Sequence, residues 1–159
     1  MLEKNQISSI NSNPITQKIN FLESAIVLYD SQIVAVSRGT PASVEFDFEK
    51  VWEFKRTIKN FNPMLLSWFH VHPFGFGSKS SHQDLICAQS LKLAFGKLGM
   101  FAILCFDDNN LENINGNISF YEFREEQYLS EDEPSDRIED YFKHNRTEVP
   151  YILKALSIT

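Results

Sequence analysis

Residues 64–85 read MLLSWFHVHPFGFGSKSSHQDL, and this stretch decides the fold class. Its first nine residues are almost continuously apolar, which is typical of a short strand in the middle of a β-sheet. The Gly- and Ser-containing segment after Pro73 predicts a loop. Residues 82–99 then predict a mostly buried helix that ends at a glycine, either Gly96 or Gly99.

On either side of this stretch, the spacing of apolar residues distinguishes strands from helices. Short apolar runs bounded by turn residues predict strands, whereas apolar residues three and four positions apart predict a helix. The elements expected on this basis are a hairpin with strands at about 24–29 and 32–37, a helix between Phe46 and Pro63, and strands at 100–106 and 118–125. This order predicts an α/β fold with a mixed β-sheet flanked by helices.

The length of 159 residues suits one domain with a short appendage. Residues 1–14 are rich in Asn and Ser and predict a flexible lead-in, and residues 15–126 are expected to form the α/β domain. Residues 127–159 predict an acidic linker followed by a C-terminal helix, DRIEDYFKHN, and an apolar tail that packs back on the protein.

Composition argues against several classes of function. The net charge of −6 argues against a nucleic-acid-binding protein, which needs a basic surface to neutralise phosphates. No apolar run approaches the roughly 20 residues of a membrane-spanning helix, and the polar N-terminus lacks the features of a signal peptide. Cys87 and Cys105 lie in apolar runs and are expected to be buried free thiols. We therefore expect a cytoplasmic protein without membrane or nucleic-acid partners; the sequence indicates no oligomeric state.

The chemistry of the chain is expected at two histidines and an aspartate. His70 and His72 lie two residues apart on a predicted strand, so both imidazoles leave the same face of the sheet. The loop after Pro73 is long enough to fold the start of the next helix, with Asp84, back over them. Two nitrogens and one oxygen leave the fourth position of a tetrahedral zinc ion open for water, as in catalytic zinc sites. The sequence therefore predicts one Zn²⁺ per chain on His70, His72 and Asp84.

A catalytic zinc site also needs groups that move protons and stabilise charge. Zinc lowers the pKa of a bound water to about 7, and a carboxylate has to take its proton and pass it to the leaving amine. Ser81 could donate a hydrogen bond to the oxyanion that forms on the attacked carbonyl. Simpler interpretations exist: Ser81 as a helix N-cap, Asp84 as a first-turn acid, and the histidines as ordinary core or surface residues.

Together, His70, His72, Pro73, Ser81 and Asp84 form the pattern H-x-H-P, seven residues, S-x-x-D. This pattern resembles the motif of the JAMM (MPN+ or JAB) zinc metalloprotease family. The resemblance implies a single MPN-like domain with a mixed, curved sheet flanked by helices. It also implies zinc on the two histidines and the aspartate, with the serine supporting the tetrahedral intermediate.

The family places a glutamate at the start of an upstream strand as general acid/base. Glu23 holds that position here, because it opens the predicted strand SAIVLYD. The family usually continues with small residues, as in E-x-x-G-x-L-x-G, whereas this chain has ESAIVLYD. Glu45 and Glu49 are the alternative carboxylates, just before or within the next helix. The resemblance thus implies that Glu23 and Ser81 are catalytic.

The substrate that the resemblance implies is a ubiquitin-like protein or its conjugate, cleaved in deconjugation or precursor processing. Phe74 and Phe76, beside the predicted metal, either line a groove for its tail or anchor the loop. Two other functions stay open: a non-catalytic MPN scaffold, and a JAMM-like peptidase that acts on cell-wall or phage-tail peptides. Other metal folds fit less well, because the chain lacks the C-x-x-C of zinc deaminases and the HExxH of metalloprotease helices.

Overall fold

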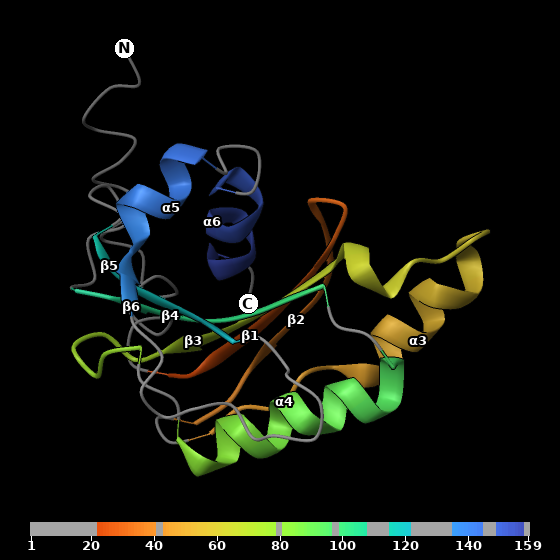
Figure 1. Cartoon of the computed structure of the whole chain (residues 1–159), viewed down its shortest axis with the longest axis horizontal. Helices are drawn as coiled ribbons and strands as arrows, with labels where there is room; N and C mark the ends of the chain where they lie inside the picture. Colours follow the sequence, from red (N-terminus) through yellow and green to blue (C-terminus); the bar gives the residue numbers. More distant parts are fainter. Residues whose placement is uncertain are drawn as a thin grey trace.

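The computed structural model describes residues 22–40, 43–78, 81–96, 99–107, 115–121, 135–144 and 149–157. In chain order, the elements are β1 (Ser24–Tyr29), β2 (Gln32–Arg38), α3 (Phe48–Thr57), the 3₁₀ helix η1 (Pro63–Leu65), β3 (Leu66–His72), α4 (His82–Phe95), β4 (Met100–Phe106), β5 (Gly116–Tyr121), β6 (Ser135–Arg137), α5 (Ile138–His144) and α6 (Val149–Ser157) (Figure 1). The predicted lead-in of residues 1–14 and the acidic linker predicted from residue 127 to 134 lie outside the described residues.

The strands form one six-stranded sheet in the order β2-β1-β3-β4-β5-β6. Strands β3 and β4 are parallel, and α4 makes the crossover between them. The other neighbouring pairs are antiparallel. The predicted α/β fold with a mixed sheet flanked by helices is therefore confirmed.

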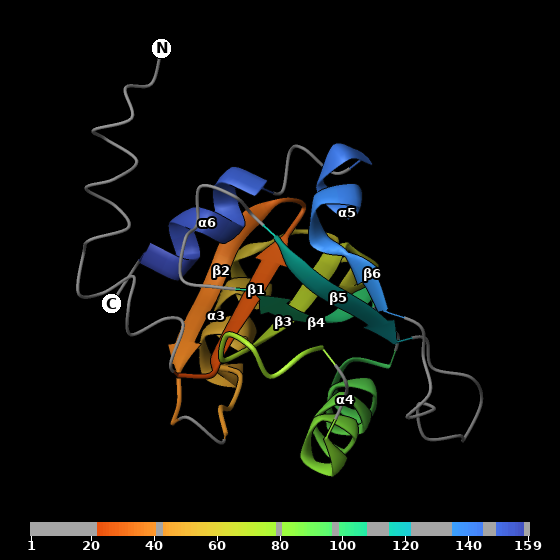
Figure 2. The same ribbon diagram turned by 90° about the vertical axis from the view of Figure 1, so that its left-hand side faces the viewer.

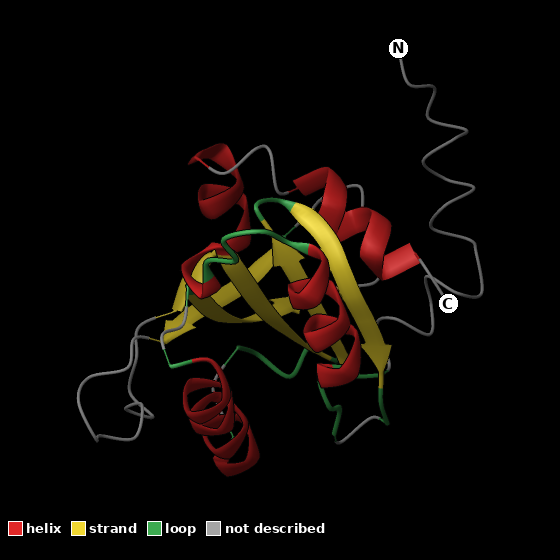
Figure 3. Ribbon diagram, turned by 90° about the vertical axis from the view of Figure 1, so that its right-hand side faces the viewer, coloured by secondary structure: helices red, strands yellow, loops and turns green. Residues whose placement is uncertain are grey.

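Helices cover both faces of the sheet, so the molecule has three layers (Figures 1 and 2). Helices α5 and α6 pack on one face, and α3 and α4 pack on the other, as Figure 3 also shows. Successive side chains of a strand point to opposite faces, so the central strands supply apolar residues to both cores. The core beneath α5 and α6 includes Ile26, Leu28, Phe69, Val71, Leu104, Ile118 and Ile152. The core beneath α3 and α4 includes Val27, Val51, Leu66, Trp68, Leu91, Phe101 and Ile103.

The hairpin of β1 and β2 forms where the sequence predicts it. Asp30 and Ser31 at its turn have φ values of 46° and 65°. Two successive positive φ values are typical of the tight turn whose twist matches that of the flanking strands. The first strand of this hairpin matters for the site because β1 also pairs with β3, which places its start beside His70 and Val71.

Two details differ from the sequence prediction. Met64 and Leu65 belong to η1 and not to the strand, because Pro63 starts a turn in which the Asn62 side chain accepts a hydrogen bond from Met64 N. Residues 135–137 form β6 against β5, where the sequence predicts the start of a helix. A three-residue strand is too short to show a period in its sequence.

The C-terminal residues complete the sheet and one of its cores. Ile152, Ala155 and Leu156 of α6 are fully buried beside the sheet, so the apolar tail packs back as predicted. The Arg38 guanidinium, at the end of β2, donates to the Leu156 carbonyl at 2.7 Å and ties α6 to the hairpin. In the described part of the chain, none of the helices has the length and apolar character needed to cross a bilayer.

Candidate metal centre

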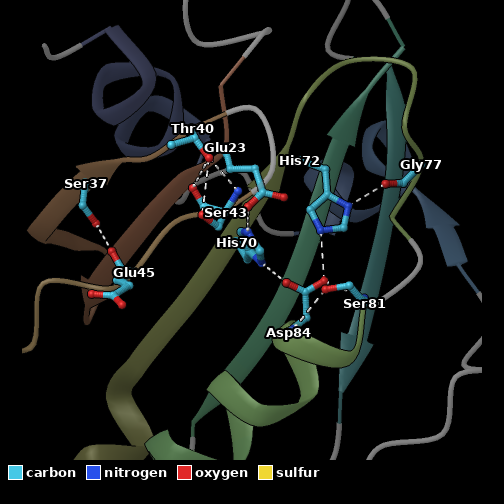
Figure 4. A network of polar contacts seen from close by, with 10 residues as sticks. All are labelled: Glu23, Ser37, Thr40, Ser43, Glu45, His70, His72, Gly77, Ser81 and Asp84. Carbon is cyan, nitrogen blue, oxygen red and sulfur yellow. Dashed lines mark hydrogen bonds and ion pairs between the residues drawn. The ribbon is translucent and has the colours of Figure 1, made fainter.

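The two histidines of the motif lie at the C-terminal end of β3 (Figure 4). Phe69 and Val71 enter the core beneath α5 and α6, so the alternating His70 and His72 project from the opposite face. Only 6% of His70 and 8% of His72 is exposed, and their ring centroids are 4.9 Å apart. The predicted convergence of the two imidazoles is confirmed.

Glu23 reaches the histidines because it directly precedes β1, which pairs with β3. Ala25 of β1 faces His70 in the antiparallel register, and Glu23, two positions earlier, projects from the same face. Hydrogen bonds fix its main chain: Glu23 N donates to Thr40 O at 3.0 Å, and Gly39 N donates to Glu23 O at 2.9 Å. The Glu23 carboxylate is buried, with Oε2 3.2 Å from His70 Nε2.

Asp84 is held at the start of α4 by a capping box. Ser81 Oγ accepts a hydrogen bond from Asp84 N at 3.2 Å, and Asp84 Oδ2 accepts one from Ser81 N at 2.7 Å. The same carboxylate contacts both histidines: Oδ1 lies 2.5 Å from His70 Nδ1, and Oδ2 lies 3.1 Å from His72 Nε2. The loop therefore folds the helix start back over the histidines.

Glu23, His70 and His72 form a buried group that could hold a metal ion. One potential ligand atom from each lies within 4.8 Å of those from the other two. The sequence predicted Asp84 as the third ligand and Glu23 as the nearby acid/base, and the structure brings both carboxylates against His70. Imidazole and carboxylate groups together suit zinc and other divalent transition metals.

The His72 ring has a hydrogen-bonding pattern that fits a metal ligand. Its Nδ1 lies 2.9 Å from the carbonyl oxygen of Gly77, which only accepts, so Nδ1 carries a hydrogen. In a neutral ring Nε2 then has a lone pair, and this lone pair faces Asp84 Oδ2, another acceptor. Metal-bound histidines commonly donate their other N–H to a carbonyl in this way.

The buried carboxylates attract positive charge into this group. Burial alone would lower the pKa of His70, but hydrogen bonds and negative charges from Asp84 and Glu23 outweigh burial and raise it to about 9. Burial alone would raise the pKa of Asp84, but hydrogen bonds from His70 and His72 and the positive charge of His70 hold it well below its usual range. The group is therefore suited to a bound cation.

A cleft of about 350 Å³ gives access to the group. Glu23, His70, Ser81 and Asp84 line it, together with Val44, Glu45 and Phe48 from the segment leading into α3 and Ile86, Cys87 and Ser90 from α4. Gly39, directly after β2, lets this segment approach the end of that strand, because a Cβ there would overlap the Ser43 carbonyl oxygen. A molecule that enters the cleft reaches the buried histidine and both carboxylates.

The other predicted residues have different outcomes. Ser81 is the N-cap of α4, and its role toward an oxyanion stays a prediction. Phe76 is 76% exposed and so does not anchor its loop, and neither Phe74 nor Phe76 lines the cleft. Of the alternative carboxylates, Glu45 lines the cleft, whereas Glu49 is exposed in the first turn of α3.

Sequence reasoning missed two features of the site. The Gly77 carbonyl orients His72, but a main-chain carbonyl has no residue type that reveals it; the one signal is a glycine, here with φ +76°. The segment 43–48 forms a wall of the cleft, which follows from tertiary packing alone.

Both Cys87 and Cys105 are free thiols, and Cys105 is buried whereas Cys87 is partly exposed.

Comparisons of the chain with protein-family models, with curated proteins and with solved structures found no match. The likeness to the JAMM pattern therefore rests on the motif residues themselves. Those residues, His70, His72, Ser81 and Asp84, come together in space with Glu23.

Proposed function

We propose that the protein is a zinc-dependent hydrolase of amide bonds, a peptidase or isopeptidase of the JAMM type. The observation that carries the proposal is the convergence of buried His70, His72, Glu23 and Asp84 beside an open cleft. Two imidazoles and two carboxylates supply both the ligands and the proton carrier of a catalytic zinc site. We expect one zinc ion per chain.

The two carboxylates have different surroundings, and these support different roles. Asp84 is fixed through both oxygens by His70, His72 and the Ser81 main chain, the kind of support that orients a metal ligand. Within the described ranges, the Glu23 carboxylate is hydrogen bonded to His70 alone, and it lines the cleft. We therefore assign Asp84 as the third zinc ligand and Glu23 as the general acid/base.

The residues of the chain then divide the chemistry among them. A bound zinc ion supplies a Lewis acid that activates water near neutral pH. Glu23 takes a proton from the attacking water and passes it to the leaving amine. The Ser81 oxygen accepts a hydrogen bond from Asp84 N, and we assign its hydroxyl hydrogen to an oxyanion in the cleft.

The substrate in this proposal is the C-terminal tail of a ubiquitin-like protein, in a conjugate or in a precursor. Its support is the likeness of the motif, together with a cleft large enough for a few extended residues. Free thiols at Cys87 and Cys105 suit a reducing compartment, and a cytoplasmic location belongs to the proposal.

Metal analysis of purified variants tests the proposal. We expect wild type to hold about one zinc ion per chain, and His72→Ala to lose it because an imidazole ligand is removed. His144→Ala is the matched control, since His144 is an exposed histidine of α5, and it should keep the zinc. A wild-type chain without zinc would refute the proposal.

Hydrolysis of a ubiquitin-like fusion separates the two carboxylates. We expect Glu23→Gln to retain zinc and to lose activity by roughly 10²- to 10⁴-fold, the usual contribution of a general acid/base. We expect Asp84→Asn to lose zinc. The opposite pattern would exchange the two roles. Zinc binding without hydrolysis of any fusion or peptide would favour a non-catalytic scaffold. Cleavage of cell-wall peptides alone would favour a peptidase that acts on cell-wall or phage-tail peptides.

A further inference from the structure

The loop after β3, residues 73–78, is attached to β4 and β5 by side chains that have no role in the chemistry proposed above. Gly77 N donates a hydrogen bond to Cys105 Sγ at 3.1 Å. The hydroxyls of Ser78 and Ser119 lie 2.8 Å apart, and both residues are buried. Cys105 of β4 and Ser119 of β5 thus both hold this loop.

Gly77 connects the attachment to the metal centre. Its N–H is held by Cys105, and its carbonyl oxygen accepts the hydrogen of His72 Nδ1 at 2.9 Å. The position of Gly77 therefore decides where its carbonyl lies relative to the imidazole. That carbonyl in turn decides which ring nitrogen keeps a lone pair.

From this chain of contacts we propose that Cys105 is a positioning residue of the metal centre. Through Gly77 it fixes the carbonyl that selects the His72 tautomer with Nε2 free to bind a metal ion. The inference rests on the proposed function for the metal. In the neutral imidazole, the tautomer itself is a property of the metal-free protein as well, and it can be measured there at a pH where the ring is neutral.

The thiol of Cys105 works in this role as a hydrogen-bonding group. Burial raises its pKa, so it stays protonated, and its S–H donates to the Pro73 carbonyl at 3.2 Å while Sγ accepts from Gly77 N. Alanine at position 105 removes both interactions. Serine keeps a donor and an acceptor on a slightly shorter side chain.

Three variants separate positioning from general destabilisation. Cys105→Ala removes the contact, Cys105→Ser preserves its chemistry, and Ile118→Val removes a methyl group on the opposite face of the sheet. Ile118 is fully buried in the core beneath α5 and α6 and faces Leu104, next to Cys105. Each full-length variant is measured for zinc affinity by competition with a chelator, and for the His72 tautomer by ¹⁵N NMR without metal.

We expect Cys105→Ala to weaken zinc binding roughly 10- to 100-fold, the range for partners that orient a metal ligand, and to mix the two His72 tautomers. Cys105→Ser should lie closer to wild type in both measurements, and Ile118→Val should match wild type. Unchanged tautomer and affinity in Cys105→Ala would overturn the proposal, as would an equal loss in Ile118→Val. If wild type binds no zinc, the proposed function fails, and the tautomer measurement alone decides the role of Cys105.

Discussion

The two faces of β3 carry different kinds of side chain, although one seven-residue strand forms both from its alternating residues. On one face, Phe69 and Val71 enter an apolar core beneath α5 and α6. On the other, Trp68 is packed beneath α3 and α4, but His70 and His72 beyond it are polar and hydrogen bonded. Because side chains alternate along a strand, β3 contributes both to an apolar core and to the candidate metal site.

The difference shows what makes buried polar groups tolerable. Each buried imidazole on the polar face has two partners. His70 contacts the carboxylates of Glu23 and Asp84, and His72 contacts the Asp84 carboxylate and the Gly77 carbonyl. Buried polar groups are stable when they are paired, and the first turn of a helix offers free N–H groups to hold such a carboxylate. The polar face is therefore organised by hydrogen bonds, and the other face by packing.

The largest loss of stability should come from truncating a side chain on the apolar face. Phe69→Ala removes a fully buried ring, and we expect a loss of about 3–5 kcal/mol in the free energy of unfolding from lost burial and the remaining cavity. Urea denaturation measures it. Ser119→Ala, a small change to a buried polar position, should cost less; an equal cost would contradict the contrast between the faces.

Zinc should raise the free energy of unfolding only when the histidines of the polar face are present. At free zinc about 1,000-fold above its Kd, wild type should gain about 4 kcal/mol in the free energy of unfolding, because only the folded chain presents the site. Phe69→Ala should keep this gain despite its lower stability, whereas His72→Ala should lose it. Thermal or urea denaturation with and without zinc tests both, and a zinc-independent wild type would contradict the prediction.

Without metal, the polar face should make stability depend on pH. The pKa of His70 is raised from 6.5 to about 9, so its stabilising contribution is complete below pH 6.5 and is lost as the pH rises through 9. The pKa of Asp84 is lowered from 3.8, so its contribution is complete above that pH and is lost as the pH falls.

Chelator-treated protein is thus expected to gain most from this pair between about pH 4 and 6.5. Denaturation midpoints across pH measure the effect. His70→Gln should flatten the profile above pH 6.5, because the group that loses its proton there is gone. An unchanged slope in His70→Gln would show that other groups cause the dependence.

The smallest effects on stability should come from substitutions at the helix caps. Ser81→Ala and Asp47→Ala each remove an N-cap, from α4 and α3, and each should cost about 1 kcal/mol in the free energy of unfolding. Only Ser81 lines the cleft, so only Ser81→Ala should also slow hydrolysis, by roughly 10²- to 10³-fold if its hydroxyl supports the oxyanion. Equal activity in the two variants would limit Ser81 to capping.

Much of this arrangement follows from local sequence. The spacing of His70 and His72 fixes their common face, and the loop length lets Asp84 return to them, so these contacts were predictable. The helix end at Gly96 was also predictable, because its φ of +77° favours glycine.

Other features depend on contacts between distant parts of the chain. The short strand β6 exists only because β5 offers it an edge, and its three residues show no period. The Gly77 carbonyl and the Cys105 thiol act through hydrogen bonds that the spacing of residues in the sequence does not predict. The close grouping of Glu23 with both histidines likewise comes from the pairing of β1 with β3, across 47 positions of sequence to His70.

The capping box of Ser81 and Asp84 has a consequence for how such a chain can change over generations. An asparagine at position 84 would still offer an oxygen to Ser81 N and an N–H to the Ser81 hydroxyl, so the helix start could persist. The negative charge facing the histidines would be gone. One substitution could thus remove a charge that the proposed metal site needs and leave the architecture in place. A chain with the proposed activity and an inert scaffold of the same fold would then differ at a single position.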